Sequence, residues 1–388
     1  MVSTGLSQLI ENPSIVANYG RLGLLYNQAS ISTDLRESAD VLFEVFGERL
    51  TTLFGPQHGV GTTEQDNMIE TDHSLHRRLG LPIFSLYSST RRPTLGMLEN
   101  VDAMLVDIQD VGTRVYTFCS TIVYVMDVCA SLGKPVIILD RPNPINGRDV
   151  EGNCLDPEYA SFVGPYPIPM RHGMTVGELM SYYNEQLSRK CELVIVEMKG
   201  WDRNYFFEDT QLPWAFPSPN MPTVDTAIVY PGQVILEGTN LSEGRGTARP
   251  FEVFGAPFLS PENIIKDVST EALHGAALRI VEFTPVFNKW SGLRCFGFQI
   301  HVTDRNRYHP YRGSLSLLGA VIRNSHEDFM WSQPPYEYVF DKAPVDVILG
   351  NSNIRESIER GGSVFDMEKE WEDDLKRFGE ARNAFLLY

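Results

Sequence analysis

The stretch VDAMLVDIQDVGTRVYTFCSTIVYVMDVCASLGKPVIILDRPNP, residues 101–144, decides the fold class. It contains two short apolar runs, 101–110 and 134–144, and each turns abruptly polar at its end. Residues 117–133 between the runs have the apolar spacing of a helix and end at a glycine, the residue type that often follows a helix C-terminus. A strand, a helix and another strand in this order are typical of a parallel sheet covered by helices.

The same alternation continues on both sides of this stretch. Residues 39–50 have helical apolar spacing, and a second helix is expected at 174–187, where Thr175 is followed by Glu178 in the pattern of a capping box. Further apolar runs predict strands at 21–30, 51–59, 81–88 and 191–201. The first half of the chain is therefore predicted to be an α/β domain.

The second half has a different texture. A proline-rich segment, 212–232, separates the two, and with 388 residues the chain is long enough for two domains. We expect domains at 1–228 and 229–388, the second being a smaller α+β domain. Within it, 235–258 has the composition of a loop, and the charged amphipathic helix at 367–388 is expected to face solvent.

The charge of the chain limits its partners. Lysine and arginine number 33 and aspartate and glutamate 50, which gives a net charge of −17. Such a chain repels nucleic acid and anionic membranes, although a local arginine cluster can still bind an anion. No apolar run approaches the length of a membrane span, and residues 1–20 lack the features of a signal peptide. A soluble, cytoplasmic protein is expected.

The five cysteines are odd in number and contain no CxxC pair. Their spacing is typical neither of a disulfide framework nor of a zinc site. We expect buried free thiols in a reducing compartment.

Polar residues cluster where the predicted strands end. In parallel sheets, ligands bind beyond the carboxyl ends of the strands, so four such ends indicate one site. The residues concerned are Asn27, Gln28, Gln57, His58, Asp107, Gln109, Asp110, Asp140, Arg141 and Asn143.

The loop FGPQHGVGTTEQDNM, residues 54–68, could serve several chemistries. It matches neither phosphate-loop pattern and has no nearby lysine, which argues against a nucleotide. His58, His73 and His76, with Asp66 and Asp72 between them, leave a metal site open, although no HExxH motif is present. No GxSxG motif marks a serine nucleophile, but a spatial triad is not excluded by sequence.

Acid–base chemistry by carboxylates is the remaining class. A glycosidase needs a general acid with a raised pKa, and loops rich in proline, glycine and aromatic residues can supply the poor solvation. The alternative for each acid is a helix cap or an ion pair with Arg114, Arg141, Arg171 or Arg245. The candidates are Glu64, Glu70, Asp107, Asp110, Asp140, Glu237 and Glu243.

Five motifs in order resemble the exo-β-N-acetylmuramidase family, long described as a domain of unknown function. They are QDVGTRVYTF (109–118), LDRPNPINGRDVEG (139–152), PIPMRHGMTVGEL (167–179), PSPNMPT (217–223) and EGTNLSEGRGTARPFEVFGAP (237–257). The resemblance implies a Rossmann-like N-terminal domain, a smaller α+β domain and a site in the cleft between them. It implies release of terminal, non-reducing β-1,4-linked N-acetylmuramic acid from peptidoglycan fragments, with no metal and no cofactor.

One position departs from the family pattern. Where the loop of the family has glutamate before histidine, this chain has Gln57, which cannot donate a proton as a carboxylic acid does, and this indicates a distinct subgroup. Glu64 in the same loop is our first candidate for the acid. Asp110, Glu237 or Glu243 are the alternatives, and a third reading is that the chain binds sugar with little hydrolysis or cleaves a variant substrate.

The remaining roles follow at positions that match the motifs. Arg114, Arg141 and Arg245 are candidates for binding the lactyl carboxylate of muramic acid, because a guanidinium matches a carboxylate. His58 and His172 could bind sugar hydroxyls, and Tyr116 could stack on the ring. Each of these residues could instead be structural, and for Asn143 the turn is the preferred reading. The expected substrate-binding residues are Gln57, His58, Gln109, Arg114, Tyr116, Asp140, Arg141, Asn143, His172, Asn220, Glu237, Asn240 and Arg245, and the expected catalytic residues are Glu64, Asp110 and Glu243.

Two rival functions stay open. One is a non-catalytic sugar-binding or sensor protein, and the other is a metal-dependent hydrolase of another small substrate. The oligomeric state and the stereochemical outcome are not indicated by the sequence.

Overall fold

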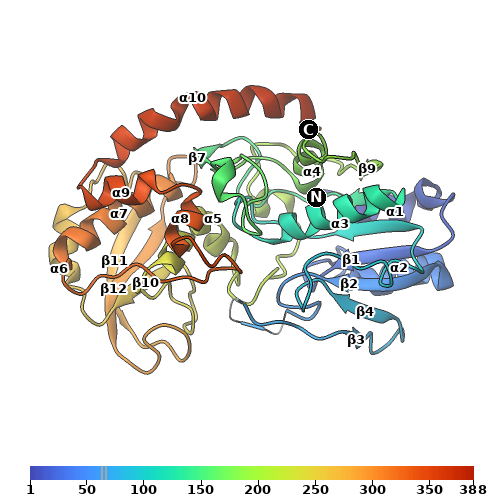
Figure 1. The fold of residues 1–388 in the computed structure, drawn as a ribbon, viewed down its shortest axis with the longest axis horizontal. Helices are drawn as coiled ribbons and strands as arrows, with labels where there is room; N and C mark the ends of the chain where they lie inside the picture. Colours follow the sequence, from blue (N-terminus) through green and yellow to red (C-terminus); the bar gives the residue numbers. More distant parts are fainter. Residues whose placement is uncertain (63, 66–67) are drawn as a thin grey trace.

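The structure, a computed structural model, describes residues 1–62, 64–65 and 68–388 (Figure 1). The N-terminal domain is built on a seven-stranded sheet with the order β3-β4-β2-β1-β5-β6-β9. The strands are β1 (Leu22–Tyr26), β2 (Leu50–Gly55), β3 (Ser74–Leu75), β4 (Pro82–Ser85), β5 (Ala103–Asp107), β6 (Val136–Leu139) and β9 (Leu193–Val196). Six of them are parallel, and β3 pairs antiparallel at one edge. The six parallel strands have the order of the Rossmann fold, so the predicted fold class is confirmed.

Alternation of side chains along the strands gives the sheet two buried faces. Leu24, Leu105 and Ile137 pack on one face against α1 (Gly5–Glu11) and α2 (Ser38–Phe46). Their chain neighbours point the other way and pack against α3 (Phe118–Leu132) and α4 (Val176–Asn184). Strands buried on both faces need continuous apolar runs, which is the pattern that the sequence shows.

The predicted helix boundaries are confirmed at two points. Gly133 ends α3 in the left-handed conformation with φ of 65°, which glycine adopts without steric cost. Thr175 and Glu178 form the predicted capping box at the start of α4.

The C-terminal domain has a three-stranded antiparallel sheet with the order β10-β12-β11. Its strands are β10 (Val253–Ala256), β11 (Ala276–Phe283) and β12 (Cys295–Val302). Its helices are α5 (Val224–Gln233), α6 (Pro261–Asp267), α7 (Pro310–Asn324), α8 (Pro344–Leu349), α9 (Asn353–Glu359) and α10 (Val364–Arg382). A separate hairpin joins β7 (Glu151–Cys154) to β8 (Pro169–Arg171), and short 3₁₀ helices lie at Pro13–Val16, Gly47–Arg49, Pro157–Tyr159, Phe207–Thr210, Val234–Gly238 and Asn383–Phe385.

Three details differ from the sequence reading. The proline-rich segment ends in a helix, α5, which contains Pro231 and packs on α7, and the domain boundary at residue 228 stays a prediction. Strand β10 lies in the segment 235–258, where the composition predicts a loop. Helix α10 does not simply face solvent, because Met367, Trp371 and Phe378 are buried along one stripe of it. The many charged residues between these three positions conceal the stripe in the sequence.

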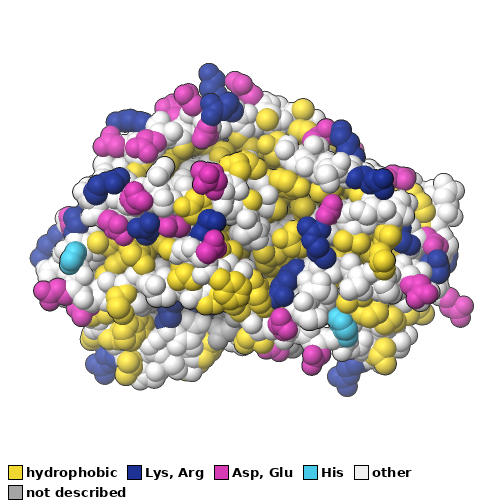
Figure 2. Space-filling view, in the orientation of Figure 1, with side chains coloured by type: hydrophobic (Ala, Val, Ile, Leu, Met, Phe, Trp, Pro, Cys, Tyr) yellow, Lys and Arg dark blue, Asp and Glu magenta, His cyan; other side chains and the backbone are white. Residues whose placement is uncertain are grey.

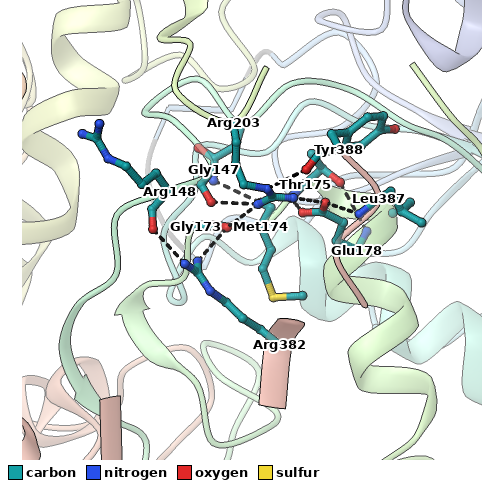
Figure 3. Close-up of polar contacts among 12 residues, drawn as sticks. Gly147, Arg148, Gly173, Met174, Thr175, Glu178, Arg203, Arg382, Leu387 and Tyr388 are labelled. Carbon is teal, nitrogen blue, oxygen red and sulfur yellow. Dashed lines mark hydrogen bonds and ion pairs between the residues drawn. The ribbon is translucent and has the colours of Figure 1, made fainter. Parts of the chain in front are cut away.

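Helix α10 and the residues after it connect the two domains. The helix runs from the C-terminal domain across to the N-terminal domain, where the C-terminus lies beside α4 (Figure 1). Arg382 donates hydrogen bonds to the carbonyls of His172, Gly173 and Arg148 (Figure 3). The backbone amide of Leu387 donates to Glu178 at 2.8 Å (Figure 3). These bonds fix the end of the chain to the N-terminal domain.

Acidic and basic side chains are interspersed over the face in Figure 2, which shows no basic stripe. Within the described residues, no helix is both long and apolar enough to cross a membrane.

Candidate active site

A small, partly open cavity lies where the two domains meet. It holds about 30 Å³, which is room for roughly two water molecules. The N-terminal domain lines it with residues that follow β2 and with the start of α3. The C-terminal domain lines it with residues of α5, of the 3₁₀ helix Val234–Gly238 and of loops. The polar residues of the lining are Gln57, His58, Tyr116, Thr117, Ser218, Tyr230, Glu237, Arg245, Tyr336 and Glu337. A sugar ring is larger than this space, so its entry requires lining side chains to move.

Gln57 is held between the two domains. Its side-chain carbonyl accepts a hydrogen bond from the Thr117 hydroxyl at 2.5 Å, which orients the amide nitrogen toward Glu337. That nitrogen donates to Glu337 Oε1 at 3.0 Å. The other oxygen of Glu337 accepts from the Tyr87 hydroxyl at 2.7 Å. The amide that replaces an acid in the loop therefore contacts a buried acid from the other domain.

Burial raises the pKa of Glu337 above its ordinary value, although the hydrogen bonds from Tyr87 and Gln57 act in the opposite direction. The nearby charge of Glu237 raises it further. The backbone is left-handed at Glu337 and at Tyr338, with φ of 43° and 67°. Non-glycine residues in this region are uncommon and cluster at functional sites.

A second group of charges lies beside this pair. Arg245 donates to Glu237 at 2.7 Å and is 3.1 Å from Glu243, and Lys289 is 2.9 Å from Glu243. The Tyr336 hydroxyl donates to Glu237 at 2.6 Å. Burial lowers the pKa of Arg245, but Glu237 and Glu243 outweigh it, and the net pKa is raised. For Glu243, burial raises the pKa, but the charges of Lys289 and Arg245 outweigh burial, so the net pKa is lowered. This environment suits an ionised Glu243 and weighs against its predicted role as a proton donor.

His58 lines the cavity as a neutral imidazole. Burial, followed by the charge of Arg245, lowers its pKa to about 4. Its Nδ1 lies 2.6 Å from the backbone carbonyl of Glu64. A carbonyl only accepts, so Nδ1 carries the proton and Nε2 keeps a lone pair for a ligand donor.

Glu64 itself points elsewhere. Its side chain lines a separate hollow of about 870 Å³ near β3 and β4. The next residue, Gln65, is held by its carbonyl, which accepts from Asn220 at 2.7 Å and from Arg245 at 3.1 Å. Gln57 and His58 therefore line the cavity, whereas Glu64 is among the residues that line the other hollow. Of the loop residues discussed above as metal ligands, Asp66 lies outside the described residues. Across the described part of the chain, no three His, Cys, Asp or Glu side chains are grouped as a metal site.

Protein side chains occupy the space beyond the carboxyl ends of the central strands. Arg141 binds Asp107 at 2.5 and 2.9 Å and donates to the Ile31 carbonyl at 2.9 Å. Residues of the segment 212–215 cover this crevice and leave only about 10 Å³. Gln109 donates to the carbonyls of Asp110 and Pro142, both at 2.8 Å. These predicted binding residues lie outside the cavity lining and have partners within their own domain.

Asp140 and Asn143 have structural contacts as well. Asp140 accepts from the Thr175 hydroxyl at 2.7 Å, from the Gly177 amide at 2.8 Å and from the Tyr388 hydroxyl at 2.8 Å. Burial raises its pKa to about 6 despite these bonds. The side chain of Asn143 donates to the Met174 carbonyl at 3.0 Å and accepts from the Ile145 amide at 3.1 Å, as in the turn that the sequence favours.

Arg114 is buried and donates to four backbone carbonyls. Nη1 bonds those of Asn153 and Ile168 at 2.8 and 2.9 Å, and Nη2 bonds those of Ile348 and Leu349 at 3.0 and 2.8 Å. The first two belong to the hairpin region and the last two to α8. Arg114 therefore joins segments from the two halves of the chain and does not line the cavity.

Asp110, His172 and Asn240 are also outside the lining. Asp110 accepts from the Gly112 amide at 2.6 Å and lies 3.4 Å from His172 Nε2. Asn240 donates to the Asp328 carbonyl at 2.8 Å and accepts from the Met330 amide at 3.1 Å. Of the predicted site residues, the structure brings together five at the cavity: Gln57, His58, Tyr116, Glu237 and Arg245.

The sequence reading missed Glu337, Tyr336 and Tyr87. Glu337 lies in PPYEYVF, residues 334–340, an acid among prolines and aromatic residues. The rule that such loops desolvate acids applies to this segment and is a signal that could have found it. Its pairing with Gln57, 280 positions away, has no local signal.

Comparisons with family models and with a known relative point to the same family. The N-terminal part of the exo-β-N-acetylmuramidase NamZ family matches residues 22–225, and its C-terminal part matches 228–388. A peptidoglycan β-N-acetylmuramidase NamZ from Bacillus subtilis (strain 168) is 42% identical over 387 residues, covering 100% of this chain and 91% of that protein.

Two crystal structures of DUF1343 family proteins from Bacteroides fragilis NCTC 9343 have the same fold. One has a TM-score of 0.88 at 31% identity, and the other 0.77 at 27%. Each comparison covers 100% of this chain and 99% of the other. On the two matches that together span nearly the whole sequence, the chain belongs to the exo-β-N-acetylmuramidase NamZ family, as its motifs predicted.

Proposed function

We propose that this chain is a glycoside hydrolase that releases terminal, non-reducing β-1,4-linked N-acetylmuramic acid from peptidoglycan fragments. Membership of the family and the name of the Bacillus subtilis relative support the reaction class. The observation that carries the proposal is that two buried glutamates, Glu237 and Glu337, line the same small cavity in different electrostatic environments.

The two environments fit the needs of glycoside cleavage. The reaction needs a proton donor and a way to stabilise a developing oxocarbenium-like centre. Glu237 is compensated by Arg245, whereas burial favours the protonated form of Glu337. Carboxyls whose environments differ in this way commonly take different roles.

We propose that the five predicted residues at the cavity contact the sugar. His58 has a lone pair for a hydroxyl donor, and Arg245 is the remaining candidate for the lactyl carboxylate. Tyr116 contacts Tyr230 edge to face, with ring centroids 5.9 Å apart, and supplies an apolar wall.

Release of a chromogenic aglycone from a β-muramic acid glycoside tests the proposal. We expect turnover by the parent protein, unaffected by a chelator. Loss of activity with the chelator would instead favour the metal-dependent alternative. The predicted acids are tested in the same assay through Glu64→Gln, Asp110→Asn and Glu243→Gln.

A non-catalytic sugar-binding protein is the second candidate, and Gln57 is the observation that favours it. Calorimetry with N-acetylmuramic acid and with a disaccharide that carries it separates the two. Binding of both sugars with no release of product would support the sensor and contradict the hydrolase.

We also propose a reducing compartment, the cytoplasm, because all five cysteines are free thiols and four of them are buried. Recovery of the protein in the cytoplasmic fraction of its native cells tests this.

A further inference from the structure

We propose that Glu337 is the general acid of this chain and protonates the glycosidic oxygen from the position facing Gln57. The inference rests on the proposed hydrolysis and adds the group that performs its first proton transfer.

Two fixed donors hold the Glu337 carboxyl in the cavity wall. The Gln57 amide reaches Oε1 at 3.0 Å, and the Tyr87 hydroxyl reaches Oε2 at 2.7 Å. The Met68 amide donates to the Tyr87 oxygen at 3.2 Å, which leaves the phenol proton for Glu337. Each carboxyl oxygen has a second lone-pair position, so a proton can sit on the carboxyl without displacing Gln57 or Tyr87.

Burial is the largest cause of the net raised pKa of Glu337, while the nearby charges act in opposite directions, because Glu237 raises its pKa and Arg91 lowers it. Within the described residues, no ion pair joins Glu337 to a basic side chain, in contrast to Glu237 and Glu243. Its side chain is almost fully buried, with 3% of the residue exposed, and Glu237 adds a second negative charge to the same cavity. A carboxyl in such a place is a better proton donor near neutral pH than one compensated by arginine or lysine.

The other acids are placed less well for this role. Glu64 lines the hollow on the far side of its loop. Asp110 accepts from the Gly112 amide and lies against His172, outside the cavity lining. Glu243 has two cationic partners.

Contacts across the domains position the Glu337 segment. The Arg91 guanidinium lies over the Tyr338 ring at 3.5 Å and over the Tyr87 ring at 4.9 Å. These contacts stabilise the left-handed backbone at Glu337 and Tyr338. Glu337 is therefore presented by its own loop and fixed by the N-terminal domain.

The step balances as an ordinary hydrolysis. The bond from the anomeric carbon to the glycosidic oxygen breaks, its electron pair goes to that oxygen, and the oxygen takes the Glu337 proton. A water adds to the anomeric carbon and gives up a proton, which restores the Glu337 carboxyl.

The test compares two substrates that need acid assistance to different extents. A disaccharide with N-acetylmuramic acid at its non-reducing end has a poor leaving group, and a 2,4-dinitrophenyl muramic acid glycoside has a good one. We expect Glu337→Gln to lower kcat on the disaccharide by about 10²–10⁴-fold and on the aryl glycoside by less than about tenfold. The basic limb of the pH–rate profile should disappear with it. Glu64→Gln is the matched control and should keep the parental rate on both.

A reciprocal exchange sharpens the result. The double variant Gln57→Glu, Glu337→Gln moves the acid to the other side of a 3.0 Å hydrogen bond and should recover at least about tenfold over Glu337→Gln alone. Tyr87→Phe, which keeps the Glu337 carboxyl, should move the basic limb to higher pH, because the lost hydrogen bond holds the pKa of Glu337 down.

Four results would overturn the proposal. They are a parental disaccharide rate in Glu337→Gln, an equal loss on both substrates, an unchanged basic limb in Tyr87→Phe, and no recovery in a folded double variant. A parent that hydrolyses neither substrate would overturn the proposed function itself, and this inference with it. If Glu337→Gln fails to fold, the Tyr87→Phe profile alone decides.

Discussion

The molecule contains two sets of buried polar residues that look alike in burial and differ in their partners. The strand-end set, defined by Asp107, Asp140, Arg141 and Asn143, is bonded almost entirely to nearby parts of the N-terminal domain. The cavity set, defined by Gln57, His58, Glu237, Arg245 and Glu337, spans both domains and lines the small cavity between them. Burial and polarity alone therefore do not identify a site in this fold. Polar residues from both domains that line a common cavity are the better indication. We therefore expect the strand-end set to act in stability and the cavity set to act in the proposed reaction.

The largest effect is expected in the strand-end set. Arg141→Met leaves the fully buried Asp107 without its cation, which should lower the free energy of unfolding by about 3–5 kcal/mol. Chemical denaturation measures this. Lys190→Met, which breaks an exposed pair with Glu185, is the control and should change stability by less than about 0.5 kcal/mol. Equal effects in the two variants would remove the distinction between the sets.

His58, in the cavity set, should make the stability of the protein depend on pH below neutrality. The pKa of His58 is lowered to about 4, which means that folding favours the neutral imidazole. The stability that this contributes is fully present above pH 6.5 and is lost as the pH falls to 4. Over that window the parent should lose about 3 kcal/mol more than His58→Gln, which has no imidazole to protonate. Unfolding free energies at pH 7 and pH 4 measure the difference. Parallel losses in the two proteins would contradict a buried neutral histidine.

Asp140 should make the free energy of unfolding change with pH in the opposite direction. Its pKa is raised to about 6, so folding favours the protonated form, and that stability is present below pH 3.8 and lost as the pH rises through 6. Between these values the parent should lose about 2–3 kcal/mol relative to Asp140→Asn. The same denaturation series, with added points between pH 4 and pH 7, measures it. Slopes of the same sign for the two sites would show that the sets share one electrostatic environment.

The smallest effect is expected for Glu64. Because its side chain lines the separate hollow, Glu64→Gln should change kcat on the disaccharide by less than about twofold. A loss of a hundredfold or more would return the acid role to Glu64, as the sequence first suggested.

The N-terminal sheet could be predicted because its signals are local. Each parallel strand needs a continuous apolar run, and α3 and α4 carry their own end signals in Gly133 and Thr175. Helix α5 was harder to predict, because Pro231 and its proline-rich surroundings indicate a loop although packing on α7 supports a helix. The stripe on α10 was concealed by the charges between its buried positions.

The candidate site could be predicted only in part. Gln57 and His58 follow a strand, so the topology of the sheet points to them. The same rule also selects Asp140 and Arg141, because a strand-end residue that closes the domain has the same sequence signature as one that binds a ligand. Glu337 contacts Gln57 through a pairing between distant segments, which no local pattern encodes.

Arg114 has a consequence for how the molecule can move. Its guanidinium joins carbonyls from the hairpin region and from α8, so drawing the domains apart there would leave several buried N–H groups without acceptors, at a cost of several kcal/mol. The domains are therefore pinned at that point, and a wide hinge opening is costly. Under the proposed function, a sugar would reach the 30 Å³ cavity by displacement of the loop residues 56–62 and 334–338, or by a rotation that keeps Arg114 as its axis. The rate of substrate entry would then depend on the mobility of two loops rather than on that of two domains.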